Sequence, residues 1–377
     1  MTEPGPPVDI AETRAGEPRP PRDLGPAVAV EPDGAGDFVR RLHLARWLPI
    51  LAMLVLIFGL GAYTNSREPS FSSEFNLNGL FIATLPLALA AMGQTSALMV
   101  KAFDVSVGAL MTVCVVAASF VLTADAGWGQ LLLGMLFVFA VAMATGATNV
   151  TLIRGLGLSS IIATLATLSI LEGIALWQRP QPDGIISSRF IDFMLKSVGF
   201  VPIAFIVIVM IALAADVWLY RSAGGLAARA AGMDEQAAER RGVRVRFLFV
   251  RAFFISAFAA AVGGLFLAAQ VGIGDPTIGS SYTLQSIAAA VLGGASLFGG
   301  RGSFVGAVVG ALFLNVIINV LPFLGWSASY GRIMVGILTL LALTFYQAPE
   351  LLAQIRTAIG NFRVSRGRAA GAAATDA

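Results

Sequence analysis

The sequence predicts an all-α integral membrane protein with about ten transmembrane helices, the number of apolar runs that reach spanning length. Of the 377 residues, 57% are hydrophobic and only 12% are charged, whereas soluble domains carry about 25% charged residues. The apolar residues are gathered in long runs that lack charge. Backbone groups in lipid must be bonded internally, and runs of this length favour helices over barrel strands. A single water-soluble core is excluded.

The apolar runs set the expected helices. Each run approaches or exceeds the roughly 17–25 residues that a helix needs to cross the hydrocarbon layer. They are 47–66, 75–100, 105–124, 126–153, 155–171, 197–215, 252–274, 276–300, 302–331 and 333–349. We therefore expect a membrane domain over 47–349, interrupted by one long loop at 221–250, and a C-terminal tail over 350–377.

The N-terminal segment has a different composition. Residues 1–38 contain eight prolines and eight acidic residues, and they hold too few large apolar side chains to form a core. The first apolar run starts at Trp47, after a basic stretch, and this order is typical of a retained first span and not of a cleaved signal peptide. The composition predicts a disordered tail over 1–46.

The basic residues predict the topology. With the N-terminus inside, twenty Lys and Arg residues fall in cytoplasmic segments and five fall outside. This is a strong positive-inside bias. We therefore expect both termini in the cytoplasm, and we interpret the net charge of +3 as a sign of topology and not of nucleic-acid binding.

Several chemistries are excluded by the rare residues. The single cysteine, Cys114, cannot form an intrachain disulfide, and the single histidine, His43, precedes the first span. No histidine relay or zinc cluster can therefore lie in the membrane, and we expect no metal site. A G-x-x-x-x-G-K-[ST] phosphate loop is also absent, so any ATP must be bound by another chain.

The loop at 221–250 is the only long one between spans. Its centre, Met233 to Arg241, is rich in Ala, Glu, Gln and Arg, which favour helix. Gly232 and Gly242 are plausible helix ends, and acidic residues in the first turn suit the helix dipole. Two interpretations stay open at this point: a docking surface for a cytosolic partner, or an ordinary basic loop that follows the positive-inside rule.

Four motifs carry a resemblance to a known family. In the loop, the pattern G-x-x-x-x-A-A-x-x-x-G-[IV] is present from Gly232 to Val243. Segments 101–111 (KAFDVSVGALM), 163–176 (ATLATLSILEGIAL) and 288–321 (AAAVLGGASLFGGRGSFVGAVVGALFLNVIINVL) follow the same order as in that family. The chain resembles the permease subunits of bacterial ABC importers of the ribose, xylose and galactose type, the monosaccharide branch of binding-protein-dependent transport. The motifs cover roughly residues 77–346.

The resemblance implies a fold, partners and a site. It implies ten helices per subunit in the bacterial plasma membrane, a second permease copy in a homo- or heterodimer, a cytosolic ABC ATPase and a periplasmic or lipid-anchored binding protein. ATP and Mg would be bound by the ATPase, so we expect no cofactor and no catalysis in this chain. The residues implied to couple to the ATPase are Gly232, Asp234, Glu235, Ala237, Ala238, Arg241 and Gly242.

Two acidic residues lie next to apolar runs. Asp104 either lines the pathway, as acids within membranes often do, or caps the following helix with help from Ser106; we favour the cap. Its expected place is near the cytoplasmic end, where water could reach it. The family usually has glycine before this acid, whereas this chain has Ala102-Phe103. Glu172, near the expected outer end of the fifth span, could either accept sugar hydroxyls or pair with Arg179.

Uncharged polar residues suggest a pathway for a neutral polyol, which must bind weakly enough to be released. Serine and threonine in membrane helices more often bond to their own backbone, so both roles stay open for each residue. Asn315 and Asn319 share one helix face and either join helices or line the path. Together with the two acids, the candidates for the path are Gln94, Asp104, Ser106, Thr164, Thr167, Glu172, Tyr282, Gln285, Asn315 and Asn319.

Gly302, Gly306 and Gly310 form a small-x-x-x-small stripe that allows close helix packing. The favoured function is the permease subunit of an ATP-driven importer for a small neutral sugar. Nucleosides or branched-chain amino acids are alternative substrates. An ion-coupled secondary transporter is a further alternative, although its coupling acids would all lie near helix ends.

Overall fold

The computed structural model describes residues 33–327, 329–331, 333–341 and 344. By contacts the chain divides into two units, Met1–Leu44 and Ala45–Ala377, and the contacts described below lie within the second. The predicted C-terminal tail at 350–377 lies outside the described residues. So do residues 1–32 of the predicted N-terminal tail, but helix α1 begins at Asp33. The disordered tail predicted over 1–46 stays a prediction.

The described part of the chain is mostly helical, as the apolar runs predict. Seven helical stretches are long and apolar enough to cross a membrane. They are α1 (its Trp47–Arg67 part), α2 (Glu74–Met99), α4 with the π-helical turn η2 (Trp128–Gly155), α5 (Ser160–Gln178), α7 (Ile203–Arg221), α10 (Val245–Val271) and α12 (Phe304–Phe323).

Three further apolar helices are shorter than a usual span: α3 (Val107–Val121), α11 (Tyr282–Leu292) and a helix over Ser329–Leu341. The rest of the tenth expected window, 342–349, is described only at residue 344. The expected span 276–300 yields only α11, and glycine residues interrupt its C-terminal part. Gly293 ends the helix, and Gly294, Gly299 and Gly300 have left-handed backbone angles.

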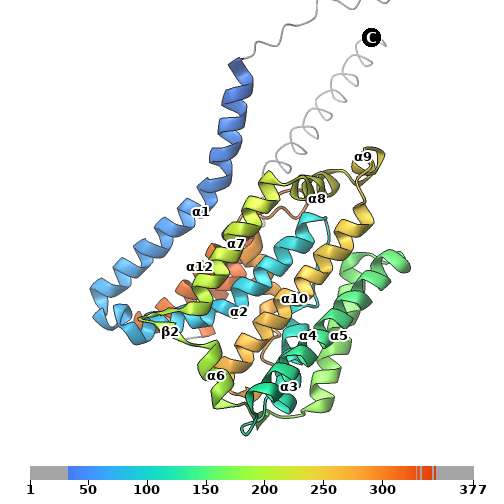
Figure 1. The fold of residues 1–377 in the computed structure, drawn as a ribbon. Coiled ribbons are helices and arrows are strands. Elements are labelled where there is room, and N and C mark those ends of the chain that lie inside the picture. Colours follow the sequence, from blue (N-terminus) through green and yellow to red (C-terminus); the bar gives the residue numbers. More distant parts are fainter. Residues whose placement is uncertain (1–32, 328, 332, 342–343, 345–377) are drawn as a thin grey trace, which may run out of the picture. The chain divides into compact units, whose positions relative to one another are not determined.

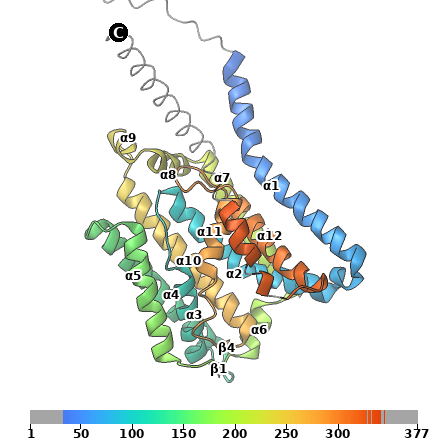
Figure 2. The same ribbon diagram turned by 180° about the vertical axis from the view of Figure 1, so that it is seen from behind.

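The segments between the long helices contain short helices and strands. Loop helices are η1 (Pro69–Ser72), α6 (Ser188–Met194), α8 (Ala223–Met233) and α9 (Glu235–Arg240). The four strands are very short and form two antiparallel pairs. β1 (Asp183–Ile185) pairs with β4 (Ile273–Gly274), and β2 (Ser197–Val198) pairs with β3 (Val201–Pro202). Figures 1 and 2 place α8 and α9 at one end of the helical bundle and β1 and β4 at the other.

Helix ends follow local chemistry. The hydroxyl of Ser73 accepts the N–H of Asn76 at the start of α2, and Ser159 and Ser303 cap α5 and α12 in the same way. These caps satisfy backbone donors that a helix start otherwise leaves unpaired. The fifth expected span, 155–171, is displaced to 160–178, because Gly157 has φ +73° and Ser159 starts the helix later.

The core lies around α2, α10 and α12. About 78% of the most apolar window of α10 is buried within the chain, against 22% for α7. The central helices are rich in alanine and glycine, which permit close approach of helices. In contrast, α4, α5 and α7 expose large apolar side chains such as Leu133, Ile162 and Met210, which is the surface expected to face lipid or a second subunit.

Candidate functional site

A buried carboxylate fixes the turn between α2 and α3. Asp104 is 2% exposed. Its Oδ1 accepts the backbone N–H of Ser106 at 3.1 Å and the Ser106 hydroxyl at 2.6 Å, while its Oδ2 accepts the hydroxyl of Ser256, on α10, at 2.7 Å. The expectation that water solvates Asp104 is therefore wrong. Three donors from the chain replace that water, as a buried charge requires.

The network continues from this carboxylate into α4 and α5. The Asn149 side-chain amide donates to the Ser106 hydroxyl at 2.9 Å, and the Thr167 hydroxyl donates to Asn149 Oδ1 at 2.7 Å. Thr164 Oγ1 accepts the N–H of Val105 at 3.2 Å. The turn between α2 and α3 is thus held by α4, α5 and α10 at once.

Sequence reasoning missed Asn149 and Ser256. Asn149 is a primary amide inside the run 126–153, where an unpaired amide costs several kcal/mol, and that cost is a signal that could have singled it out. Ser256 has no such signal, because one hydroxyl in a helix can bond to its own backbone. Its partner, Asp104, lies 152 positions away.

The loop at 221–250 forms two helices, where one over 233–241 was expected. Asp234 has an extended backbone (φ −151°, ψ 105°) that separates α8 from α9, and its Oδ1 accepts the N–H of Ala237 at 2.9 Å. Gly232 therefore lies in the last turn of α8 and does not precede a helix. Gly242, at φ +81°, makes the turn after α9, where residues with a side chain are strained.

Gly232 joins these short helices to the core through backbone contacts. A Cβ at this position would collide with the carbonyl oxygen of Met99 and with the backbone nitrogen of Gly300. The Gly300 N–H in turn donates to the Met99 carbonyl at 3.1 Å. The last turn of α8, the end of α2 and the loop before α12 therefore meet without intervening side chains.

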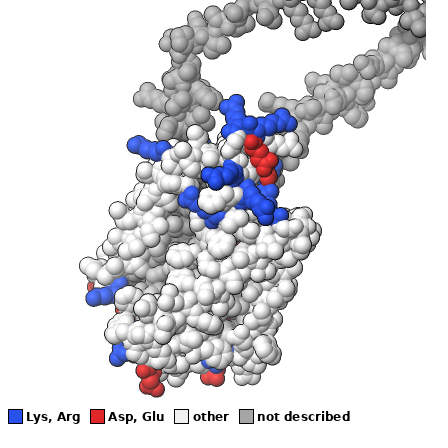
Figure 3. All heavy atoms as spheres, turned by 45° about the vertical axis from the view of Figure 1, so that its right-hand side comes forward, with Lys and Arg blue, Asp and Glu red and all other residues white. Residues whose placement is uncertain are grey.

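α9 presents an exposed polar surface over a buried anchor. Ala238 is buried, whereas Glu235, Ala237 and Arg241 are exposed. Glu235 Oε1 pairs with Arg154 Nη1, from η2, at 2.7 Å. Figure 3 shows Lys and Arg side chains gathering at the end of the bundle at which α8 and α9 lie.

The other polar candidates do not converge with this network. Gln94 is fully buried on α2, and neither of its amide atoms bonds to a described residue. Tyr282 and Gln285 are half-buried at the start of α11. Asn319 exchanges hydrogen bonds with Asn76 of α2 at 3.0 and 3.2 Å, and Asn315 donates to the Ala311 carbonyl of its own helix at 3.1 Å.

The glycine stripe of α12 lies against other backbones. Cβ atoms added at Gly306 and Gly310 would collide with the carbonyl groups of Gly293 and Ala289 on α11. At Gly302, a Cβ would press on the side chains of Met99 and Thr95 of α2. Gly306 and Gly310 therefore let α12 pack directly against the backbone of α11 and its C-cap.

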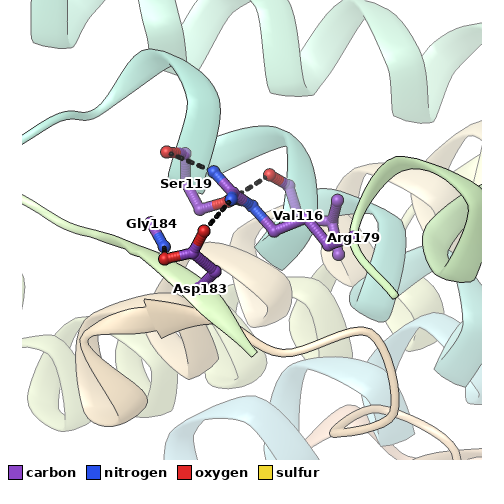
Figure 4. A network of polar contacts seen from close by, with 5 residues as sticks. All are labelled: Val116, Ser119, Arg179, Asp183 and Gly184. Carbon is purple, nitrogen blue, oxygen red and sulfur yellow. Dashed lines mark hydrogen bonds and ion pairs between the residues drawn. The ribbon is translucent and has the colours of Figure 1, made fainter. Parts of the chain in front are cut away.

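At the opposite end, Arg179 lies in a polar network that excludes Glu172 (Figure 4). Its guanidinium donates to the Ser119 hydroxyl at 2.7 Å and to the Ser119 carbonyl at 3.3 Å, and it pairs with Asp183 at 3.4 Å. The expected alternative of a Glu172–Arg179 pair is wrong. Because α5 extends to Gln178, Glu172 lies inside the helix, half-buried, and not at its outer end.

A hollow of about 950 Å³ opens at this same end. Trp128 and Phe193 meet edge to face there with ring centroids 5.9 Å apart. Asp125, Asp192, Arg189 and Lys196 surround them. Among the residues that the structure describes, no cluster of His, Cys, Asp or Glu could hold a metal ion.

A bundle of membrane-length helices with a basic end and a few buried polar side chains is typical of a membrane transport subunit. The chain belongs to the family described as the branched-chain amino acid transport system permease component, whose model matches residues 76–343. It is thus a multi-pass permease of the bacterial plasma membrane, and the resemblance to importer permeases that the four motifs indicate is confirmed.

Curated relatives support the same assignment. The chain is 32% identical over 306 residues to the autoinducer 2 import system permease protein LsrC of Yersinia enterocolitica serotype O:8 / biotype 1B, covering 78% of this chain and 81% of the relative. It is also 32% identical over 305 residues to the LsrC protein of Enterobacter sp. (strain 638), covering 80% and 85%. No solved structure matches the chain significantly.

Proposed function

We propose that this permease is the membrane-spanning subunit of an ATP-driven ABC importer that moves a small neutral sugar. The contact of Gly232 with Met99 and Gly300 supports the proposal most directly. It joins the two exposed short helices to the core without deformable side chains. A partner that displaces α8 and α9 would therefore displace the end of α2 with them.

The cytosolic ATPase is the partner proposed for this surface. ATP and Mg would be bound by that subunit, and this chain would carry no cofactor and catalyse no reaction. The proposed coupling residues remain those of the predicted set from Gly232 to Gly242. Within it, Asp234 caps α9, Ala238 anchors it and Glu235 ties it to Arg154.

The charges of the interior favour a neutral substrate. Among the described residues, Asp104 and Asp216 are the only buried charged side chains. Both are occupied by bonds within the chain, since Asp216 accepts the Ser303 hydroxyl at 2.6 Å and the Phe304 N–H at 2.7 Å. No buried charge is left to hold a charged substrate. The unpaired amide of Gln94 is our first candidate for a group that bonds to sugar hydroxyls.

The topology proposed is ten helices with both termini in the cytoplasm. The seven long stretches and three shorter apolar helices give that number if the short ones cross within the bundle. The basic end carrying α8 and α9 would then be cytoplasmic by the positive-inside rule. The hollow around Trp128 and Phe193 would face outward and receive the substrate-binding protein. A second permease copy would complete the assembly.

Branched-chain amino acids are the alternative substrate that a specific observation favours. The family's description names branched-chain amino acids, whereas the named relatives import autoinducer 2. The test is uptake of labelled ribose, xylose, galactose, arabinose, inositol, a nucleoside, leucine and autoinducer 2 in a deletion strain and its complemented parent. Each uptake is measured with an uncoupler and, separately, after ATP depletion.

We expect the deletion strain to lose the uptake of one sugar. In the parent, that uptake should require ATP and resist the uncoupler. Loss of leucine uptake alone would support the ATP-driven importer but show that its substrate is leucine and not a sugar. Uptake that collapses with the uncoupler at constant ATP would overturn the proposal in favour of a secondary transporter.

A further inference from the structure

A shallow groove lies between α7 and α10 near the end that carries α8 and α9. Figure 1 shows α2 running between these two helices, and its residues Ser96, Met99 and Val100 contribute to the lining. Trp218 of α7 and Arg251 of α10 stand on the two sides. The groove encloses only about 30 Å³, so an occupant would lie across it and not inside it.

Arg251 brings an unsatisfied positive charge to this groove. Its guanidinium carbon lies 4.1 Å from the centroid of the Trp218 ring. Within the described part of the chain, it forms no hydrogen bond or ion pair. Stacking on the indole fixes the guanidinium by a cation–π interaction but uses none of its five N–H donors. The donors remain available to an anion.

Arg251 lies near the end of the bundle that carries α8 and α9, where the proposed topology puts the lipid headgroups. It lies six residues after Val245, the first residue of α10, which is about 9 Å along the helix. Helical side chains tilt toward the N-terminus of their helix, so Arg251 leans back toward the end with α8 and α9. Trp218 lies three residues before the end of α7, at a position typical of interfacial tryptophan.

The surroundings of the cation are suited to an acyl chain. Apart from Arg251 and Ser96, the groove is lined by apolar side chains, including Leu248, Ile255 and Phe304. The neighbouring face of α7 exposes Ile206, Met210 and Val217. A phosphate at Arg251 would thus continue into an apolar wall. An isolated soluble anion would gain nothing from that wall.

We propose that this groove, built from Arg251, Trp218 and Ser96, is a binding site for an anionic phospholipid. The headgroup phosphate would accept hydrogen bonds from the Arg251 guanidinium, and the acyl chain would lie along α7. Basic side chains on the cytoplasmic side of membrane proteins bind anionic lipids in this manner. The site is independent of the transported substrate.

The test uses the full-length protein purified in detergent. Native mass spectrometry measures binding of phosphatidylglycerol and of phosphatidylcholine to the wild type, to Arg251→Gln and to Arg251→Lys. Arg246→Gln is the matched control, because it removes the same charge from an exposed position in the first turn of α10, outside the groove lining. A phosphatidylglycerol titration in the presence of inorganic phosphate separates a lipid from a soluble anion.

Preference for phosphatidylglycerol is expected to fall about fivefold in Arg251→Gln, the factor that one basic residue contributes near an anionic surface. Arg251→Lys and Arg246→Gln are expected to stay within about twofold of the wild type, which is below that factor. Equal losses in Arg251→Gln and Arg246→Gln would overturn the site. Displacement of the lipid by millimolar phosphate, or changed substrate uptake with unchanged lipid binding, would also overturn it.

Discussion

The two ends of the helical bundle are held by contacts that differ in burial. At the end with α8 and α9, Gly232 meets Met99 and Gly300 backbone to backbone, and the nearby Asp104 carboxylate is buried with three hydrogen bonds. At the other end, Arg179 pairs with Asp183, whose side chain is 83% exposed. Where two backbones are packed together with no space between them, one cannot move without the other. At an exposed ion pair, solvent competes for the charges and weakens the contact. On the proposed function, the first end follows the movement of the ATPase and the second end rearranges.

The largest effect is expected from Gly232→Val. The new side chain would overlap the backbones of Met99 and Gly300, and overpacking costs about 1–3 kcal/mol or more. We expect ATP-driven uptake to fall below detection while the protein still reaches the membrane. Gly79→Ala is the control, since a Cβ at that position meets nothing within 4 Å. Uptake of Gly232→Val at the wild-type rate would show that the contact transmits nothing.

The next largest effect is expected from Asp104→Ala. It removes the acceptor of the Ser106 and Ser256 hydroxyls, and each buried group left unpaired costs about 1–3 kcal/mol. Thermal denaturation in detergent should show a clear fall in the unfolding midpoint. Asp125→Ala, at an exposed acid, should leave it unchanged. An equal, small shift in both variants would mean that the buried network adds no stability.

A smaller effect is expected from Arg179→Gln. The substitution removes the bond to Ser119 at 2.7 Å and the pair with Asp183, so the midpoint should fall by less than in Asp104→Ala. Asp183→Asn should cost less still, about 0–1 kcal/mol, because exposed ion pairs contribute little. If Arg179→Gln destabilises the protein more than Asp104→Ala does, the two ends do not differ as described.

The smallest effect is expected at the Arg154–Glu235 pair. Their side chains are 26% and 47% exposed, so a double-mutant cycle with Arg154→Gln and Glu235→Gln should give a coupling energy of about 0.2–1 kcal/mol. The coupling should weaken as salt is added. A coupling energy above about 2 kcal/mol would place this pair among the rigid contacts.

The helices could be predicted from sequence wherever an apolar run is uninterrupted. The predictions failed where local chemistry cuts or extends a run. Gly293 and its neighbours shorten α11, and the turn at Gly157 shifts α5 to Ser160–Gln178. Composition averages over such details, whereas a helix end depends on single residues.

The candidate site was predictable only in part. Ser106, Thr164 and Thr167 stand out as polar residues beside apolar runs, and the structure brings them to Asp104. Their partners Asn149 and Ser256 come from other helices, and tertiary packing selects them. The contact of Gly232 with Gly300 could not be predicted from the sequence either, because 68 positions separate the two glycines.

The central proposal is that the end with α8 and α9 faces the cytoplasm and binds the ATPase. The most direct measurement is maleimide labelling of Gln236→Cys, an exposed position on α9, with Ser188→Cys at the other end as reference. The native Cys114 is buried and should not react. We predict that Gln236→Cys is labelled only in inside-out vesicles and is protected by the bound ATPase, while Ser188→Cys is labelled in intact cells. Labelling of Gln236→Cys from outside would contradict the account.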